Sequence, residues 1–466
     1  MIGKKILAFK AMALMLAMFA ASILFAEEAA VPQFQNGDRV CFIGDSITHG
    51  GQYHVQILLY YLTRFPDRKF EAYNCGVSGD YAGGVLKRYD WDIKPHNPTV
   101  STIMLGMNDV GRDNYGKDKT GPDFDNKHKW ALEGYMKNMT KLSEMLAADK
   151  SKIIYLTPSI YDQTGNMSSH NYFGVNDALG TCAQEGRRLS EKFNGGLVDF
   201  HGLMSRINEE QQKKNSSFTI VGGDRVHPGM EGHFVMAYAF LKAQKCPSIV
   251  SDMSVDAAKS AVVKQDNCQI TELKAENGTV SFTCKENALP FPISDVMVKK
   301  LEPLVPFTND LNREMLSVSG LAAGDYKILI DGQEVQEATA EDLAKGINIA
   351  NNSKTPQYKQ AWAVSDPVWK KYNLESSKLR SIVCIRNGIL ANAKVKPGDV
   401  EAEKKVLEAE LDKCKKSNNK YVAGLIETYM KCAPDQKKFE DEAAAFWESA
   451  YSKNQTKPHK FEIRKK

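Results

Sequence analysis

Five short apolar runs in the first half of the chain constrain its fold more than any other feature. Each run is rich in β-branched or aromatic residues, and they span residues 39–43, 69–73, 100–105, 152–157 and 196–200. Continuous apolar runs of this length are typical of strands buried on both faces. Strands that alternate with helices predict an α/β fold: a doubly wound, flavodoxin-like, five-stranded parallel sheet with helices on both faces.

Helix-like segments separate these runs. One helix is expected at about residues 55–65, and a second runs from Trp130 to Leu146 with apolar residues three or four positions apart. A helix that starts near Gly229 and ends around Lys245 closes the layer of helices. These segments supply the crossovers that a parallel sheet needs.

The pattern changes after Pro247. Residues 260–335 predict hairpins, because Asn277-Gly278 and Asp331-Gly332 separate strand-like runs and supply the positive φ angles of tight turns. Residues 400–450 are heavily charged and helical in pattern. We therefore divide the chain into a signal segment, an α/β domain and a smaller α+β accessory region, at residues 1–26, 27–250 and 251–466.

The N-terminus has the pattern of a secretory signal. Lys4, Lys5 and Lys10 precede an apolar stretch from Ala11 to Ala26. Cleavage after Ala26 predicts an exported protein, periplasmic or extracellular. An uncleaved anchor is the alternative, but the stretch is shorter than the about 20 apolar residues of a spanning helix. We expect no stable membrane insertion after cleavage.

Net charge gives no sign of a polyanionic partner. Removal of the signal takes away three lysines and no acidic residue, so Lys and Arg fall from 61 to 58 against 57 Asp and Glu. The near-neutral balance predicts no nucleic-acid partner.

Four polar blocks carry the chemistry. They are Gly44-Asp45-Ser46-Ile47, Asn74-Cys75-Gly76-Val77-Ser78-Gly79-Asp80, Gly106-Met107-Asn108-Asp109 and Asp224-Arg225-Val226-His227. In this order they resemble the blocks of the SGNH (GDSL-type) hydrolases, over roughly residues 36–245. A weaker likeness, at residues 316–332, is to a C-terminal extension of some secreted bacterial members.

The resemblance implies a serine esterase. Ser46 would be the nucleophile, His227 the general base and Asp224 the carboxylate that orients the imidazole. The oxyanion hole would comprise the backbone N–H groups of Ser46 and Gly79 and the side-chain amide of Asn108. Because N–H donors hold the oxyanion, we expect no metal and no organic cofactor.

The nucleophile block differs from that of the α/β-hydrolases. Thr48 stands where the second glycine of a Gly-x-Ser-x-Gly elbow would be. An ordinary strand-to-helix turn capped by Ser or Asp is the alternative interpretation of this block taken alone.

Polar loops at residues 110–129 and 161–173 follow two of the blocks and are expected to overhang the site. We expect substrate contacts from Arg112, Tyr115 and Trp130, and also from His49, which is close to the nucleophile in sequence. Polar and aromatic rims suit sugars, although both loops could be no more than solvated surface.

Export and the polar rim together favour an esterase that removes O-acyl groups, acetyl in particular, from carbohydrate. The partner would be an acylated saccharide or another small ester. A lysophospholipase or short-chain acyl esterase is one alternative. An inactive SGNH scaffold that binds glycans is another.

Overall fold

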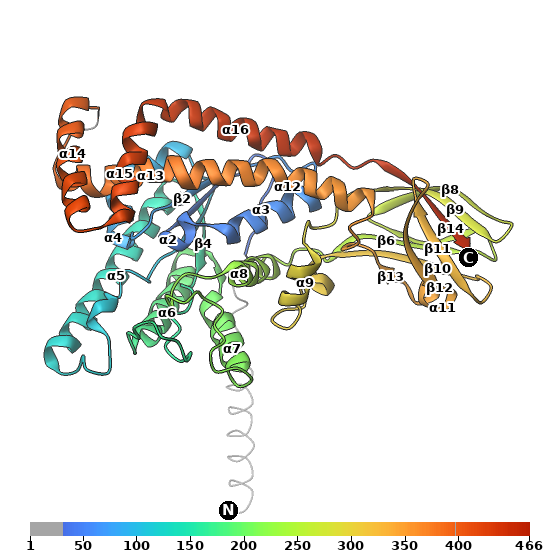
Figure 1. Cartoon of the computed structure of the whole chain (residues 1–466), viewed down its shortest axis with the longest axis horizontal. Coiled ribbons are helices and arrows are strands. Elements are labelled where there is room, and N and C mark those ends of the chain that lie inside the picture. Colours follow the sequence, from blue (N-terminus) through green and yellow to red (C-terminus); the bar gives the residue numbers. More distant parts are fainter. Residues whose placement is uncertain (1–30, 397) are drawn as a thin grey trace, which may run out of the picture.

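The computed structural model describes residues 31–396 and 398–466. Figure 1 shows an elongated molecule with an α/β body at one end and two further sheets at the other. The expected signal segment, residues 1–26, lies outside the described residues. Within the described ranges, no helix is both long enough and apolar enough to cross a membrane.

A five-stranded parallel sheet with the order β2-β1-β3-β4-β5 forms the centre of the α/β body, which confirms the predicted fold class. Its strands are β1 (Arg39–Gly44), β2 (Glu71–Gly76), β3 (Val100–Met104), β4 (Lys152–Leu156) and β5 (Gly196–Val198). Phe42 of β1 is in register with Asn74 of β2 and Thr102 of β3. The blocks after these three strands therefore meet at one edge of the sheet.

Helices cover both faces of this sheet, with turns between them. They are α2 (Ser46–His49), α3 (Gln52–Arg64), α4 (Ala82–Arg88), η1 (Tyr89–Ile93), η2 (Lys94–His96), η3 (Arg112–Asn114), α5 (Pro122–Ala148), α6 (Val175–Phe193), α7 (Phe200–Gln212) and α8 (Met230–Ala243). Buried residues of α3, α7 and α8 form one core, and those of α4, α5 and α6 form the core on the opposite face.

The predicted loop at residues 110–129 is wrong in its second half. The α5 helix begins at Pro122, so residues 122–129 are helical. Proline is favoured in the first helical turn because its fixed φ suits the helix and its missing N–H has no partner there.

Two further sheets follow, ordered β13-β10-β6-β7 and β12-β11-β14-β9-β8. Both predicted hairpins are confirmed, with positive φ at both residues of Asn277-Gly278 and of Asp331-Gly332. The strands are β6 (Ile249–Asp256), β7 (Ala261–Asp266), β8 (Cys268–Glu276), β9 (Thr279–Glu286), β10 (Arg313–Ser319), β11 (Asp325–Ile330), β12 (Gln333–Thr339), β13 (Ile347–Asn348) and β14 (Pro458–Lys465).

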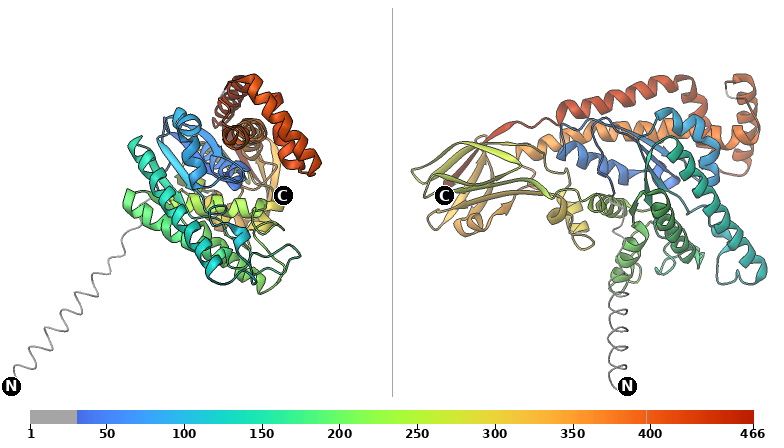
Figure 2. Two further views of the ribbon diagram at one scale, coloured as in Figure 1. Left: turned by 90° about the vertical axis from the view of Figure 1, so that its left-hand side faces the viewer. Right: turned by 180° about the vertical axis from the view of Figure 1, so that it is seen from behind.

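Helices of the C-terminal region return to the α/β body. Figures 1 and 2 show α12 and α16 side by side along it, and Val364, Val368 and Trp447 share the core of α3. The boundary at residue 250 stays a prediction. The helices and turns are α9 (Asp295–Leu301), α10 (Phe307–Leu311), α11 (Ala340–Lys345), α12 (Pro356–Leu374), η4 (Glu375–Leu379), α13 (Arg380–Ile385), η5 (Arg386–Leu390), α14 (Val400–Lys416), α15 (Lys420–Cys432), η6 (Ala433–Asp435) and α16 (Gln436–Lys453).

Candidate active site

Three of the predicted residues form one hydrogen-bonded chain. Ser46 begins α2 directly after β1, while Asp224 and His227 lie in the loop before α8. Ser46 Oγ is 2.8 Å from His227 Nε2, and His227 Nδ1 is 2.5 Å from Asp224 Oδ2. The His227 side chain is 50% exposed, so a ligand in solution can reach the imidazole.

The second carboxylate oxygen of Asp224 holds its own loop. Asp224 Oδ1 accepts the backbone N–H groups of Val226 and His227, both at 3.0 Å. Partial burial acts to raise the pKa of Asp224, but these bonds and the one from the imidazole outweigh it and lower that pKa. The resulting carboxylate accepts from Nδ1–H, which leaves Nε2 of His227 to accept from the Ser46 hydroxyl.

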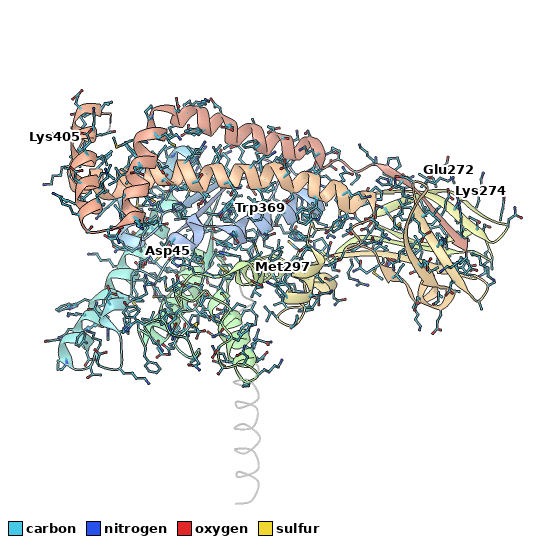
Figure 3. The ribbon with its side chains drawn as sticks, in the orientation of Figure 1. Asp45, Glu272, Lys274, Met297, Trp369 and Lys405 are labelled. Carbon is cyan, nitrogen blue, oxygen red and sulfur yellow. The ribbon has the colours of Figure 1, made fainter. Side chains whose placement is uncertain are left out.

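Two buried aspartates next to the predicted residues fix the surrounding backbone. Asp45 caps α2 by accepting from Ile47 N at 2.9 Å, and burial raises its pKa to about 6. Asp109 accepts from Ala82 N at 2.8 Å, and burial raises its pKa to about 7. Figure 3 labels Asp45 in the α/β body, at the opposite end of the molecule from Glu272 and Lys274 of the accessory sheets.

The predicted role of Gly79 as an oxyanion donor stays a prediction, and its backbone lies beside open space. Its φ is +78°, a left-handed conformation that favours glycine, and the residue is exposed. A Cβ placed there would meet no other atom within 4 Å, so the space beside this backbone is open to a ligand.

Asn108 follows β3, and its amide is held in place from two sides. Asn108 Nδ2 donates to the backbone carbonyl of Asp80 at 2.8 Å, and Arg112 Nη2 lies 3.5 Å from Asn108 Oδ1. An amide nitrogen carries two hydrogens, so the second N–H can donate to a bound oxyanion. With Ser46 after β1 and Gly79 after β2, the three predicted donors follow adjacent strands.

Two of the predicted substrate contacts are buried in the structure, and their role in binding stays a prediction. His49 is buried: its Nε2 lies 2.9 Å from Ser376 O, and its Nδ1 accepts from the Ser78 backbone at 3.2 Å. Burial lowers the pKa of His49 to about 4, so it is a neutral structural bridge. Tyr115 is also buried, and its ring stacks on His128 with a centroid distance of 3.9 Å.

The other two contacts stay predictions. Arg112 is half-buried beside Asn108, which puts its guanidinium near the predicted oxyanion hole. The Trp130 side chain is on α5 and 65% exposed, and therefore accessible to a ligand.

No sequence pattern indicates a role for Arg225, which lies between the aspartate and the histidine of its block. Arg225 is buried, has a φ of +68°, and accepts at its backbone carbonyl from Asp162 N at 2.9 Å. Its guanidinium donates to four backbone carbonyls at 2.8–3.2 Å, those of Asp162, Gly165, Met167 and Ser169. One side chain thus fastens the 161–173 loop to the Asp224–His227 segment.

Known proteins match both the α/β body and the whole chain. Residues 40–240 match the model of the GDSL-like lipase/acylhydrolase family. A solved structure of BT4096, a gut microbial diltiazem-metabolizing enzyme, is 31% identical, covers 94% of this chain and 99% of its own, and has a TM-score of 0.86. The chain belongs to the GDSL-like lipase/acylhydrolase family. It is thus a carboxylic ester hydrolase of the SGNH type with an additional C-terminal region.

A second relative of this GDSL-family enzyme is an acetylxylan esterase from Geobacillus stearothermophilus. It is 26% identical over 225 residues, which is 44% of this chain and 94% of the relative. Among the residues that the structure describes, no group of three or more His, Cys, Asp or Glu side chains could hold a metal ion.

Proposed function

We propose that this enzyme is an exported esterase that removes acetyl groups from carbohydrate. The observation that carries the proposed chemistry is the hydrogen-bonded chain from Ser46 through His227 to Asp224. Ser46 Oγ bonds to the acyl carbon while His227 Nε2 accepts the hydroxyl proton. The protonated imidazole then donates that proton to the departing alcohol, and the acyl group remains on Ser46 as an ester.

Water completes the cycle in the same geometry. His227 accepts a proton from water as the water oxygen attacks the acyl-Ser46 carbonyl, and then returns that proton to Ser46 Oγ. In both steps the N–H groups of Ser46, Gly79 and Asn108 donate to the oxyanion. Donors held in place before substrate binds stabilise the transition state without reorganisation, and the bonds of Asn108 support this for its amide.

The acetylated carbohydrate is supported by one relative and by the rim of the site. The relative is named for acetylxylan, and it matches about the length of the α/β body. Arg112 lies beside Asn108, and the 161–173 loop, which we expect to overhang the site, carries the 43% exposed Phe173. A cation and an exposed aromatic ring suit the hydroxyl groups and flat faces of a sugar.

A short-chain ester of a non-sugar alcohol is the second candidate. The relative that covers nearly the whole chain is named for diltiazem, which is not a saccharide. The intact Ser46-His227-Asp224 chain argues against an inactive, glycan-binding scaffold.

Acetate release by the purified, signal-free protein tests the proposal. The substrates are acetylated xylan, other acetylated glycans, diltiazem, and p-nitrophenyl acetate and octanoate, with Ser46→Ala as the control protein. We expect the highest kcat/KM on an acetylated saccharide. Preference for diltiazem or for octanoate would instead support the alternatives. Export is tested by cell fractionation, in which the mature chain should begin at Glu27.

A further inference from the structure

The open edge of the catalytic sheet is closed by side chains from the C-terminal helices. The β2 strand lies at the edge of the sheet, where outward backbone groups have no neighbouring strand. Side chains of α12, α13 and α16 bond to backbone groups of this strand and of Phe70, the residue before it. The pairs are Tyr451 Oη with Phe70 N (3.0 Å), Trp447 Nε1 with Phe70 O (2.7 Å), Lys371 Nζ with Ala72 O (2.8 Å) and Arg380 Nε with Gly76 O (2.8 Å).

Arg380 differs from the other capping residues because it also joins a buried ion network. Its Nη1 and Nη2 donate to Asp92 at 2.7 and 2.8 Å. Asp92 accepts in turn from Arg88, whose Nε donates to Asp80 Oδ2 at 2.7 Å. All four side chains are at most 6% exposed. Burial acts to raise the pKa of Asp92, but the guanidinium of Arg380 and then that of Arg88 outweigh it and lower it to about 2.

The network fixes both ends of the segment that carries Gly79. Arg380 bonds the carbonyl of Gly76 directly, and through Asp92 and Arg88 it holds the side chain of Asp80. The backbone carbonyl of Asp80 is the acceptor that orients the Asn108 amide. Two of the three proposed oxyanion donors therefore depend on a segment that Arg380 anchors at each end.

We propose that Arg380, in the accessory region, is a positioning residue for the oxyanion hole. The inference rests on the proposed roles of Gly79 and Asn108. Loss of the guanidinium leaves Asp92 with Arg88 as its remaining cation and frees the Gly76 carbonyl, so segment 76–80 can shift. A displacement of about 1 Å can cost about 10²-fold in rate.

Lys371 provides a matched control on the same strand edge. It is also buried, also ion-paired within α12–η4 (to Glu375, 2.6 Å), and also donates to a β2 carbonyl. It bonds Ala72, four residues before Gly76 and outside the Gly79 segment. If the loss of a bond at the strand edge is what lowers kcat, variants of Arg380 and Lys371 should lose kcat alike. If Arg380 positions the oxyanion hole, only the Arg380 variants should lose kcat.

The experiment measures kcat and KM on p-nitrophenyl acetate for full-length Arg380→Gln, Arg380→Lys, Arg380→Ala and Lys371→Met, well below each melting temperature. We expect Arg380→Gln to lower kcat about 10- to 100-fold with KM changed less than about twofold. Arg380→Lys should lower kcat by a smaller factor than Arg380→Gln. Its ammonium keeps the positive charge, but it cannot bond Asp92 and Gly76 together in a fixed fork. Lys371→Met should keep kcat within about twofold despite lower stability.

Chemical rescue gives a readout that a purely structural role would not move. Arg380 lines a cavity of about 520 Å³ between β2, α13 and α16, which is large enough to admit a small cation. Millimolar ethylguanidine should restore kcat in Arg380→Ala, and equimolar ethylammonium should restore less. Wild-type kcat in Arg380→Gln, or an equal loss of kcat in Lys371→Met, would overturn the proposal.

A Ser46→Ala protein measured alongside separates the two proposals. If Ser46→Ala is inactive while Arg380→Gln is normal, only the role of Arg380 fails. If Ser46→Ala hydrolyses the ester at the wild-type rate, the proposed site itself fails, and the role of Arg380 fails with it.

Discussion

Ser46 Oγ and His227 Nε2 lie 2.8 Å apart, although 181 positions separate the two residues in the chain. Ser46 comes at the carboxyl end of β1, and His227 lies in the loop before α8. Both therefore reach the same edge of the sheet. The lowered pKa of Asp224 completes the arrangement, because a carboxylate keeps the accepting nitrogen of His227 directed at the hydroxyl.

Asp224→Asn should lower kcat by about 10³- to 10⁴-fold with a small change in stability. The amide can donate to Nδ1, which favours the tautomer that presents an N–H to Ser46. Steady-state kinetics on p-nitrophenyl acetate, with a melting curve on the same preparation, checks this. Less than a tenfold loss in a folded variant would mean that Asp224 does not orient the base.

Asn108→Ala should lower kcat by about 10²- to 10³-fold and change KM much less, because the amide bonds the oxyanion more strongly than the carbonyl of the bound substrate. Asn114→Ala is the control, since Asn114 lies in the same loop and donates only to Gly111 O in the turn (3.2 Å). If Asn108→Ala lowers the melting temperature but keeps its kcat, Asn108 merely shapes the loop after β3.

Asp109→Asn should become more stable relative to the wild type as pH rises. Burial raises the pKa of Asp109 to about 7 in the folded chain, above the ordinary value of 3.8. The stabilising contribution of the protonated form is complete at low pH and is lost as pH rises through about 7. Asparagine stays neutral and can still accept from Ala82 N. Urea unfolding at several pH values between 4 and 8 measures this difference, and a pH-independent difference would contradict it.

Arg225→Gln should loosen the 161–173 loop. Removal of a buried guanidinium that satisfies four carbonyls should cost about 2–3 kcal/mol of unfolding free energy and admit protease cleavage within the loop. Lys345→Gln, which breaks an ion pair whose side chains are 67% and 77% exposed, is the control and should cost less than about 1 kcal/mol. Equal losses of unfolding free energy in the two variants, with no cleavage in the loop, would contradict the role of Arg225 in holding that loop.

The sequence predicts what local patterns encode. The five buried strands follow from continuous apolar runs, and the hairpins follow from Asn277-Gly278 and Asp331-Gly332. The carboxyl ends of parallel strands share an edge, so the three motif blocks that follow strands could be expected to converge before any geometry was known.

Local patterns do not predict contacts between segments that are far apart in the sequence. Trp447 and the Phe70 carbonyl that it bonds are 377 residues apart, and nothing near either residue signals the pairing. His49 likewise bonds to the backbone carbonyl of Ser376, 327 residues away, and no local pattern predicts this contact. No sequence pattern distinguishes Arg225 and Arg380 from ordinary surface arginines. Only the folded chain shows which backbone carbonyls surround their guanidinium groups.

The most direct test of the account is the site of the covalent intermediate. Protein quenched in acid during turnover of p-nitrophenyl acetate, then digested and analysed by mass spectrometry, should carry one acetyl group on the peptide that contains Ser46, and on Ser46 itself after fragmentation. Asp224→Asn should accumulate the same species more slowly, and Ser46→Ala should carry none. Acetylation of another residue at the turnover rate, together with undiminished hydrolysis by Ser46→Ala, would contradict Ser46 as the nucleophile.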